Sequence, residues 1–391
     1  MEKIAFVCQR YGKEVNGGSE LHCRQVAERL SSCYEVDVYT TCAIDYVTWK
    51  NEYPAGESYI NGVHVFRYPV KHERQRIRQG LLSRWIQFSP SHSDAAERAW
   101  IHAQGPVCDE ALDDLWEKQE QYKVIIFMTY LYYLTAIGMP RGLRHAMLIP
   151  TLHDEWPAYL KHYDRVFSAA QSIVWNSPEE LAFATQRFPG IEKTPSDIVG
   201  VGIEIPEKTS LPERITSLKD PYIVYVGRLD VSKGCGELFD FFVRYKETYS
   251  DKVKLVLVGK QNMPIPERED IIPLGFVSDE EKFGVMRNAR GLVLCSQFES
   301  LSMVVLESML LGRPVLVNGK SEVLQGHIER SGAGISYVDF DTFCMGIRIL
   351  AQDDERYRTM SVQGIRYVKE NYSWDTIIKK LVLLIEQTDA N

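Results

Sequence analysis

Short apolar runs alternate with helical patterns along most of the chain, and this alternation limits the fold more than any other feature. Several runs are apolar at consecutive positions, as strands covered on both faces are. Strands followed by helices predict a parallel sheet with right-handed crossovers. The expected strands are 3–8, 35–40, 63–68, 124–128, 146–149, 172–175, 222–226, 254–258, 291–295 and 314–317. The expected helices include 20–30, 237–245, 279–287 and 302–311.

The chain has 391 residues, which is too long for one ordinary core, so two domains are expected. A polar, proline-punctuated stretch at 204–220 has the composition of a linker. We therefore predict an α/β protein with two doubly wound, Rossmann-like domains, at 1–203 and 221–372, that face each other across a cleft. Ligands of such sheets bind at the carboxyl ends of the strands.

Charge and cysteine content narrow the class of protein. The net charge of −8 argues against bulk nucleic-acid binding, so no nucleic-acid partner is expected. The eight cysteines include no C-x-x-C pair, which leaves a zinc or thioredoxin-like site unsupported and favours a reducing cytoplasm. The N-terminal apolar run is too short for a signal peptide. The uncharged stretch 124–139 is shorter than the roughly 20 residues of a membrane span and is expected to be a strand and a short helix.

A pair of cations follows the expected strand 222–226. The segment 227–234 reads Gly-Arg-Leu-Asp-Val-Ser-Lys-Gly. The guanidinium of Arg228 matches phosphate oxygens in two-point geometry, and Lys233 adds a point charge. Glycines at both ends of the segment permit close approach of the backbone. Taken alone, the segment is also compatible with a surface loop that has incidental cations.

Two carboxylates eight positions apart, Glu299 and Glu307, straddle an expected helix start close to residue 300 or 302. Carboxylates accept hydrogen bonds from sugar hydroxyls, and the free N–H groups of a helix start bind anions. Eight helical residues span about 12 Å, comparable to the separation of the two rings in an extended nucleotide sugar. We therefore expect one glutamate at each ring, with the diphosphate between them. The alternative is a solvated loop glutamate and a helix glutamate in a salt bridge.

The Glu-x7-Glu spacing and the string at 227–234 resemble the retaining glycosyltransferases of family 4, which have the GT-B fold. Further resemblances extend over nearly the whole chain, at 17–20, 153–154, 200–204, 256–259, 274–278 and 311–315. The resemblance implies two Rossmann-like domains that face a cleft. It also implies transfer of a sugar from a nucleoside-diphosphate sugar to an acceptor hydroxyl, with retained configuration, in surface polysaccharide or glycolipid synthesis. The expected partners are a nucleotide sugar and a saccharide or lipid-linked acceptor.

The resemblance also implies roles for single residues. Arg228 and Lys233 are expected to clamp the diphosphate, and Glu299 and His153 to contact the transferred sugar. By itself, a histidine before an aspartate is more often a structural hydrogen-bonding group. The remaining donor-binding residues are expected to be Gly17 and Gly18 at the phosphate or sugar, Gly227 in the cation loop, the amides of Leu301, Ser302 and Met303, Glu307 at the ribose, and Phe276 and Val277 beside the nucleobase. Many family members have Gly-Phe-Gly where this chain has Ser-Leu-Ser at 300–302, which leaves the sugar preference open.

A D-x-D string at 339–341 precedes a helical pattern late in the chain, and this position favours a helix N-cap over metal ligation. No metal and no cofactor other than the nucleotide-sugar substrate are therefore expected. A nucleotide-sugar epimerase of the same fold is the nearest alternative. A two-lobed sugar-binding protein would have no need of the cations in 227–234, and the acidic balance opposes a nonspecific nucleic-acid binder.

Two further segments carry expectations. The stretch 71–87 interleaves basic residues with large apolar ones. It is either a solvated helix with a charged face or a contact with an anionic acceptor or a membrane surface, which would place the protein at the inner face of the membrane. One long helical pattern follows over 93–118. The amphipathic segment 373–391 has Ser373 as a plausible cap, and the resemblance implies that this helix packs back on the N-terminal domain.

Overall fold

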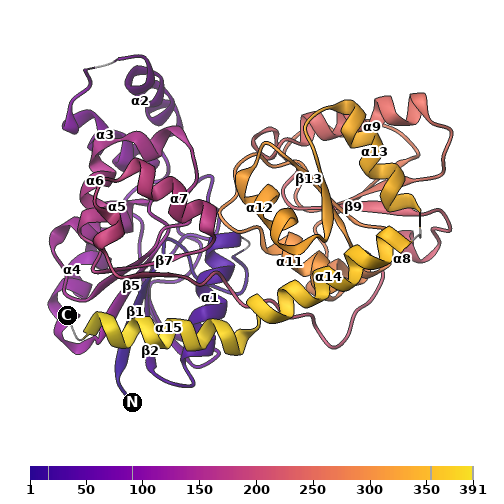
Figure 1. Cartoon of the computed structure of the whole chain (residues 1–391). Coiled ribbons are helices and arrows are strands. Elements are labelled where there is room, and N and C mark those ends of the chain that lie inside the picture. Colours follow the sequence, from indigo (N-terminus) through magenta and orange to yellow (C-terminus); the bar gives the residue numbers. More distant parts are fainter. Residues whose placement is uncertain (16, 90, 353–354, 390–391) are drawn as a thin grey trace. The chain divides into compact units, whose positions relative to one another are not determined.

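The computed structural model describes residues 1–15, 17–89, 91–352 and 355–389, and it divides the chain into two compact units (Figure 1). The first unit comprises Met1–Val201 and Ile377–Asn391, and the second comprises Gly202–Thr376. The stretch 204–220 belongs to the second unit, where it contains the short helix α8 (Glu213–Thr216). None of the described helices combines the length and the apolar character that crossing a bilayer requires.

An eight-stranded sheet forms the centre of the first unit, in the order β3-β4-β2-β1-β5-β6-β7-β8. All neighbouring strands pair parallel except β3 and β4. The central strands are buried at consecutive positions because helices cover both faces. The strands are β1 (Lys3–Val7), β2 (Glu35–Thr41), β3 (Gly56–Ile60), β4 (Val63–Tyr68), β5 (Val124–Met128), β6 (Ala146–Ile149), β7 (Ser172–Trp175) and β8 (Ser196–Ile198).

The helices of this unit are α1 (Gly18–Leu30), α2 (Arg76–Phe88), α3 (Asp94–Gln104), α4 (Asp109–Lys118), α5 (Tyr133–Gly138), α6 (Lys161–Ser168) and α7 (Pro178–Arg187), with short 3-10 turns at Gln119–Gln121, Met139–Arg141, Trp156–Tyr159 and Ile191–Lys193. The prediction of one helical stretch over 93–118 is wrong, because α3 ends at Gly105. This glycine has a φ of 70°, which a helix interior does not allow. The following Pro106 lacks the N–H that would continue the helical hydrogen bonds.

The second unit contains a six-stranded, wholly parallel sheet in the order β11-β10-β9-β12-β13-β14. Its strands are β9 (Tyr222–Val226), β10 (Lys254–Val258), β11 (Ile271–Gly275), β12 (Leu292–Leu294), β13 (Val315–Asn318) and β14 (Gly334–Tyr337). Its helices are α9 (Cys235–Thr248), α10 (Asp279–Asn288), α11 (Met303–Leu310), α12 (Glu322–Ser331), α13 (Phe340–Ala351) and α14 (Glu355–Asn371), with a 3-10 turn at Val231–Lys233. Two doubly wound sheets confirm the predicted fold class, and every predicted strand is present.

The C-terminal helix α15 (Trp374–Asp389) belongs to the first unit from Ile377 onward. Lys380 donates a hydrogen bond to the backbone oxygen of Ile198 at 2.7 Å, and the hydroxyl of Thr388 donates to that of Ser172 at 2.7 Å. These contacts join α15 to β7 and β8, at one edge of the eight-stranded sheet.

Candidate functional site

The cation loop of the second unit, 227–234, follows the carboxyl end of β9 and is joined to the loop that follows β10. The backbone N–H of Leu229 donates to the backbone oxygen of Lys260 at 3.0 Å, and the backbone N–H of Asn262 donates to the backbone oxygen of Leu229 at 2.9 Å. A side chain at Gly259, which has a φ of 138°, would overlap the backbone oxygen of Gly227. Glycine at 259 is therefore what lets the two loops touch.

The same cation loop is pinned to the end of β12. Gly234 ends the 3-10 turn in the left-handed conformation, and a side chain there would overlap the backbone oxygen of Cys295. The thiol of Cys295 donates to the backbone oxygen of Lys233 at 3.1 Å. The side chain of Asp230 caps the turn by accepting from the N–H of Ser232 at 2.9 Å. The predicted cations therefore lie on a loop that is held from two strands.

Lys233 and Glu299, predicted to bind different parts of one ligand, are paired with each other in the structure. The Lys233 Nζ lies 2.9 Å from Glu299 Oε1, with side-chain exposures of 31% and 15%. Arg228 is half-buried in the same loop, and its backbone oxygen accepts from the hydroxyl of Tyr225 at 2.8 Å. The loops after β9 and β12 thus bring Lys233 and Glu299 together, and Arg228 lies on the same loop as Lys233.

The second carboxylate, Glu307, lies on α11 and is buried. It accepts a hydrogen bond from Lys282 Nζ at 3.0 Å. Burial raises the pKa of Glu307 above its ordinary value, and the charge and hydrogen bond of Lys282 oppose this effect. Lys282 lies on α10 and was not predicted as a site residue. The alternative interpretation of the Glu-x7-Glu motif matches the structure at Glu307, which is in a salt bridge, but not at Glu299, which is paired with Lys233 and only 15% exposed.

The start of α11 is held in an unusual conformation. Ser302 precedes the helix with a φ of 67°, a value that residues other than glycine adopt at a cost. Its hydroxyl is buried and makes no hydrogen bond within the described part of the chain. The backbone oxygen of Leu301 accepts from Nε2 of the buried His327 at 2.7 Å, which fixes the turn before Met303. The described N-terminus of α11 therefore carries a serine in a left-handed conformation that glycine would adopt without strain.

We predict that Ser302→Gly raises the free energy of unfolding by about 1 kcal/mol, because it relieves the left-handed strain and removes a buried hydroxyl that lacks a partner. Urea denaturation of the whole chain would measure this change. Ser302→Ala is the matched control, since it removes the hydroxyl but keeps the strain. A glycine variant no more stable than the alanine variant would contradict the role of the backbone.

Phe276 and Val277 connect β11 to α10. The ring of Phe276 is 68% exposed, and Val277 is half-buried. Ser278 then starts α10 with a reciprocal capping box to Glu281. Lys282, the partner of Glu307, is on the first turns of the same helix. Helix α10 therefore connects Phe276 and Val277, expected beside the nucleobase, to the ion pair of Glu307. An exposed aromatic side chain on a capped, fixed turn is suited to stacking against a planar ring.

In the first unit, Gly17 and Gly18 form the start of α1, with Gly17 as its N-cap residue. A side chain at Gly17 would overlap the carboxylate of Glu20. Glu20 is buried and accepts from Arg10 Nε at 2.9 Å and from Gln9 Nε2 at 2.9 Å. Burial alone would raise the pKa of Glu20, but the charge and hydrogen bonds of Arg10, with that of Gln9, lower it. This buried pair was not predicted as part of the site, although Arg10 comes two residues after the first expected strand.

His153 follows β6 in the first unit. Its Nε2 lies 3.5 Å from Glu155 Oε1, and the same oxygen accepts from the hydroxyl of Tyr130 at 2.8 Å. Burial would raise the pKa of Glu155, but the hydrogen bond and charge of His153, with the bond from Tyr130, lower it. A second carboxyl, that of the buried Glu180, accepts from the backbone N–H of Leu152 at 2.5 Å. His153 therefore lies beside the carboxyl of Glu155, and Glu180 holds the backbone of the residue before it; neither carboxyl was predicted.

Glu180 also accepts from the backbone N–H of Asn176 at 2.5 Å, so it joins the loops that follow β6 and β7. Burial raises the pKa of Glu180 to about 8, although these backbone hydrogen bonds and the charge of His153 lower it. The signal that could have indicated Glu180 is the Ser-Pro-Glu-Glu run at 177–180, which begins two residues after an apolar strand ends.

Two other features lie away from these residues. Asp339 caps α13, accepting from the N–H of Thr342 at 2.9 Å, which confirms the N-cap role predicted for the D-x-D string. No group of three or more His, Cys, Asp or Glu that could hold a metal occurs within the described ranges.

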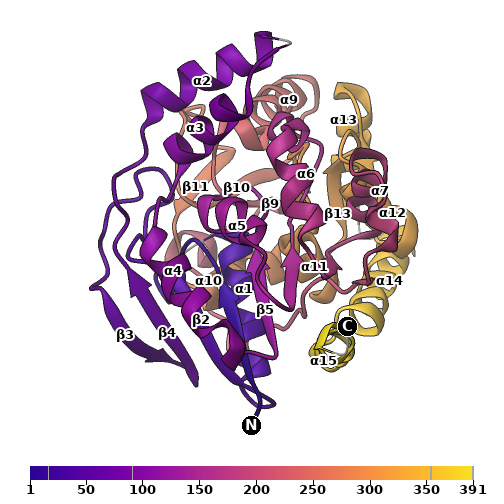
Figure 2. The ribbon, with the colours of Figure 1, turned by 90° about the vertical axis from the view of Figure 1, so that its left-hand side faces the viewer.

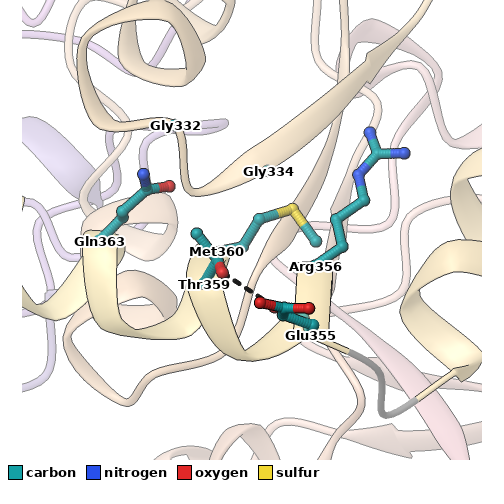
Figure 3. A pocket seen from close by; sticks show the side chains of 7 residues that line it. All are labelled: Gly332, Gly334, Glu355, Arg356, Thr359, Met360 and Gln363. Atoms are coloured by element: carbon teal, nitrogen blue, oxygen red, sulfur yellow. Dashed lines mark hydrogen bonds between the residues drawn. The ribbon is translucent and has the colours of Figure 1, made fainter.

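A hollow of about 620 Å³ on the second unit contains none of the predicted site residues (Figure 3). It is lined by Gly332, Gly334, Glu355, Arg356, Thr359, Met360 and Gln363.

Comparisons with known proteins place this geometry in context. Residues 220–353 match the family described as glycosyl transferases group 1. An uncharacterized glycosyltransferase of Methanocaldococcus jannaschii is 26% identical over 414 aligned residues, which cover 97% of each chain. A sucrose-phosphate synthase from Thermosynechococcus elongatus superposes with a TM-score of 0.71 at 17% identity, over 100% of both chains. HepE of Anabaena, in complex with UDP and glucose, gives 0.70 at 15% identity, over 99% of this chain and 100% of HepE.

Proposed function

We propose that the chain is a glycosyltransferase that transfers a sugar from a nucleoside-diphosphate donor to an acceptor hydroxyl with retained configuration. The match of residues 220–353 to glycosyl transferases group 1 and the likeness of the whole chain to GT-B structures support this proposal. The observation that supports this most is the grouping of Arg228, Lys233 and Glu299 on the loops after β9 and β12. That grouping provides cations for a diphosphate and a carboxylate for sugar hydroxyls.

We propose that Lys233 exchanges its partner when the donor binds. A diphosphate near Nζ would compete with Glu299, which lies 2.9 Å away. Once displaced, Glu299 is available to accept hydrogen bonds from the donor sugar. This exchange would explain why Lys233 and Glu299 are paired in the structure although they are assigned to different parts of the donor.

In the proposed reaction the bond between the anomeric carbon and the diphosphate oxygen breaks, and the acceptor oxygen bonds to that carbon on the same face. Arg228, Lys233 and the N–H groups at 301–303 stabilise the charge that develops on the leaving diphosphate. The leaving phosphate takes the acceptor proton. No residue is assigned as a covalent nucleophile, and retention then follows from a front-face route.

We further propose membership of family 4, a cytoplasmic location and an acceptor in surface polysaccharide or glycolipid synthesis. The UDP and glucose in the HepE complex support a nucleotide-sugar donor. Phe276, exposed on the turn before α10, is proposed beside the nucleobase, and Glu307 at the ribose. In the first unit, Gly17, Gly18 and His153 are proposed to contact the donor phosphate or sugar.

We predict that one class of UDP-, GDP- or ADP-sugar raises the melting temperature of the whole chain by several degrees, through mass action on the folded state. A thermal-shift screen, repeated with EDTA and with Mn²⁺, would measure this. Protection that persists in EDTA is expected, because no metal is assigned to the site. Protection that appears only with Mn²⁺ would contradict the metal-free assignment.

Product analysis with the protecting donor separates the two enzyme classes. A transferase leaves the donor sugar unchanged until an acceptor is added, whereas an epimerase converts it in the absence of any acceptor. Formation of an epimeric nucleotide sugar from the donor alone would reject the proposed transfer. No described feature favours the epimerase over the transferase.

A further inference from the structure

The outer face of α2 carries a stripe of large apolar side chains, Ile77, Leu81, Trp85 and Phe88, called the α2 stripe below. Their exposed fractions are 83%, 67%, 49% and 81%. At about 100° per residue, the four positions lie within an arc of about 80° on the helix. Helix α2 lies beyond α3 at the outer edge of the first unit (Figures 1 and 2). A single exposed apolar residue is ordinary, but four in register on one helix are not.

The opposite face of α2 already serves the fold. Ile86 is buried, and Leu82 packs against the main apolar core of the first unit. Ser83 accepts a hydrogen bond from Trp100 Nε1 at 2.7 Å, which anchors α2 to α3. The α2 stripe is therefore a second apolar face, in addition to the one that the core needs.

Exposed arginines surround this stripe. Arg76, Arg78 and Arg84 lie on α2, and its thirteen residues include no acidic one. On the same helical wheel, Arg78 and Arg84 flank the stripe on its two sides, each about 20° outside it. The whole chain has a net charge of −8, so this positively charged helix is opposite in sign to the chain as a whole.

We propose that the α2 stripe docks on the surface of a bilayer that contains anionic lipids. A helix of thirteen residues is about 20 Å long and would lie in the plane of the interface, with its apolar side chains among the acyl chains. The arginines on both sides would then face the lipid phosphates. A second copy of the chain fits less well, because two such helices face to face would oppose their arginines. The inference stands apart from the proposed transfer reaction, because it concerns where the protein binds.

Vesicle flotation of the whole chain tests the proposal without a donor or acceptor. The vesicles contain phosphatidylcholine alone or with about 30% phosphatidylglycerol, and binding is expected to the second kind only. Leu81→Gln with Trp85→Gln should weaken binding about tenfold or more, as should Arg78→Gln with Arg84→Gln. Raising NaCl from about 0.05 M to about 0.5 M should weaken it similarly. The matched control is Trp116→Gln on α4, which removes a tryptophan that is 42% exposed and should leave binding unchanged.

The altered side chains are exposed, so the variants should keep the melting temperature of the parent chain. Equal binding of variants and parent would overturn the proposal, as would equal binding to neutral and anionic vesicles. Light scattering gives a further test: a dimer that Leu81→Gln with Trp85→Gln abolishes would assign the stripe to a second copy instead. None of these outcomes depends on whether the chain transfers a sugar.

Discussion

Arg228→Ala and Lys233→Ala should each lower kcat by roughly 10²- to 10³-fold, equivalent to about 2–4 kcal/mol of transition-state stabilisation. The physical reason is that both cations face charge that grows on the leaving diphosphate, so their effect is larger in the transition state than in the ground state. Steady-state kinetics with the protecting donor would measure kcat and KM separately. The matched control is Lys254→Ala at the start of β10, the opposite end of the sheet, which should keep parent kinetics.

The pairing of Lys233 with Glu299 makes this prediction sharper. If a diphosphate competes with Glu299 for Lys233, then Glu299→Gln should bind a nucleoside diphosphate without sugar several-fold more tightly than the parent. The same variant should turn over the sugar donor more slowly, because the amide is a weaker acceptor for sugar hydroxyls. Calorimetric titration and kinetics on one preparation would show both effects. Full turnover in the Arg228 and Lys233 variants would reject the clamp.

The strands that the sequence pattern missed are the edges of the two sheets. They are β3 and β8 in the first sheet and β11 and β14 in the second. The pattern used here was a run of consecutive apolar residues, which is typical of strands covered on both faces. An edge strand has one paired neighbour and partly exposed side chains, as in β3, where no residue is buried. The helix break at Gly105 was different, since the Gly-Pro pair is a breaker signal that the periodicity outweighed.

The sequence indicated which residues belong to the candidate site, but not which of them form ion pairs with each other. As the pattern placed them, the cation loop follows a strand end, Glu299 lies in the loop before α11, and Glu307 lies within that helix. Lys233 and Glu299, however, are 66 positions apart, and Glu307 is 25 positions from Lys282. Which charges meet depends on which loops the sheet order brings together, and spacing along the chain does not specify this. The same holds for Glu180, which joins two loops through backbone hydrogen bonds.

Lys282→Met should lower the free energy of unfolding by about 3 kcal/mol at pH 7, because it leaves the buried carboxylate of Glu307 without its cation. Burial already raises the pKa of Glu307, and loss of the opposing charge would raise it further. A carboxyl whose folded pKa exceeds its unfolded value favours folding most below the unfolded pKa, and this advantage is lost as the pH rises through the folded pKa. The difference between variant and parent should therefore be small near pH 4 and grow toward neutrality.

Urea denaturation of the parent and four variants between about pH 4 and pH 8 tests this pairing. Lys282→Met with Glu307→Gln should recover most of the lost stability, since it leaves no buried charge behind. Arg366→Gln, which breaks an exposed pair with Glu370, is the matched control and should cost under about 0.5 kcal/mol. Glu307→Gln alone should stay folded yet lose donor protection, because the proposed ribose contact needs the carboxylate. A stable, pH-independent Lys282→Met variant would show that Glu307 does not depend on this cation.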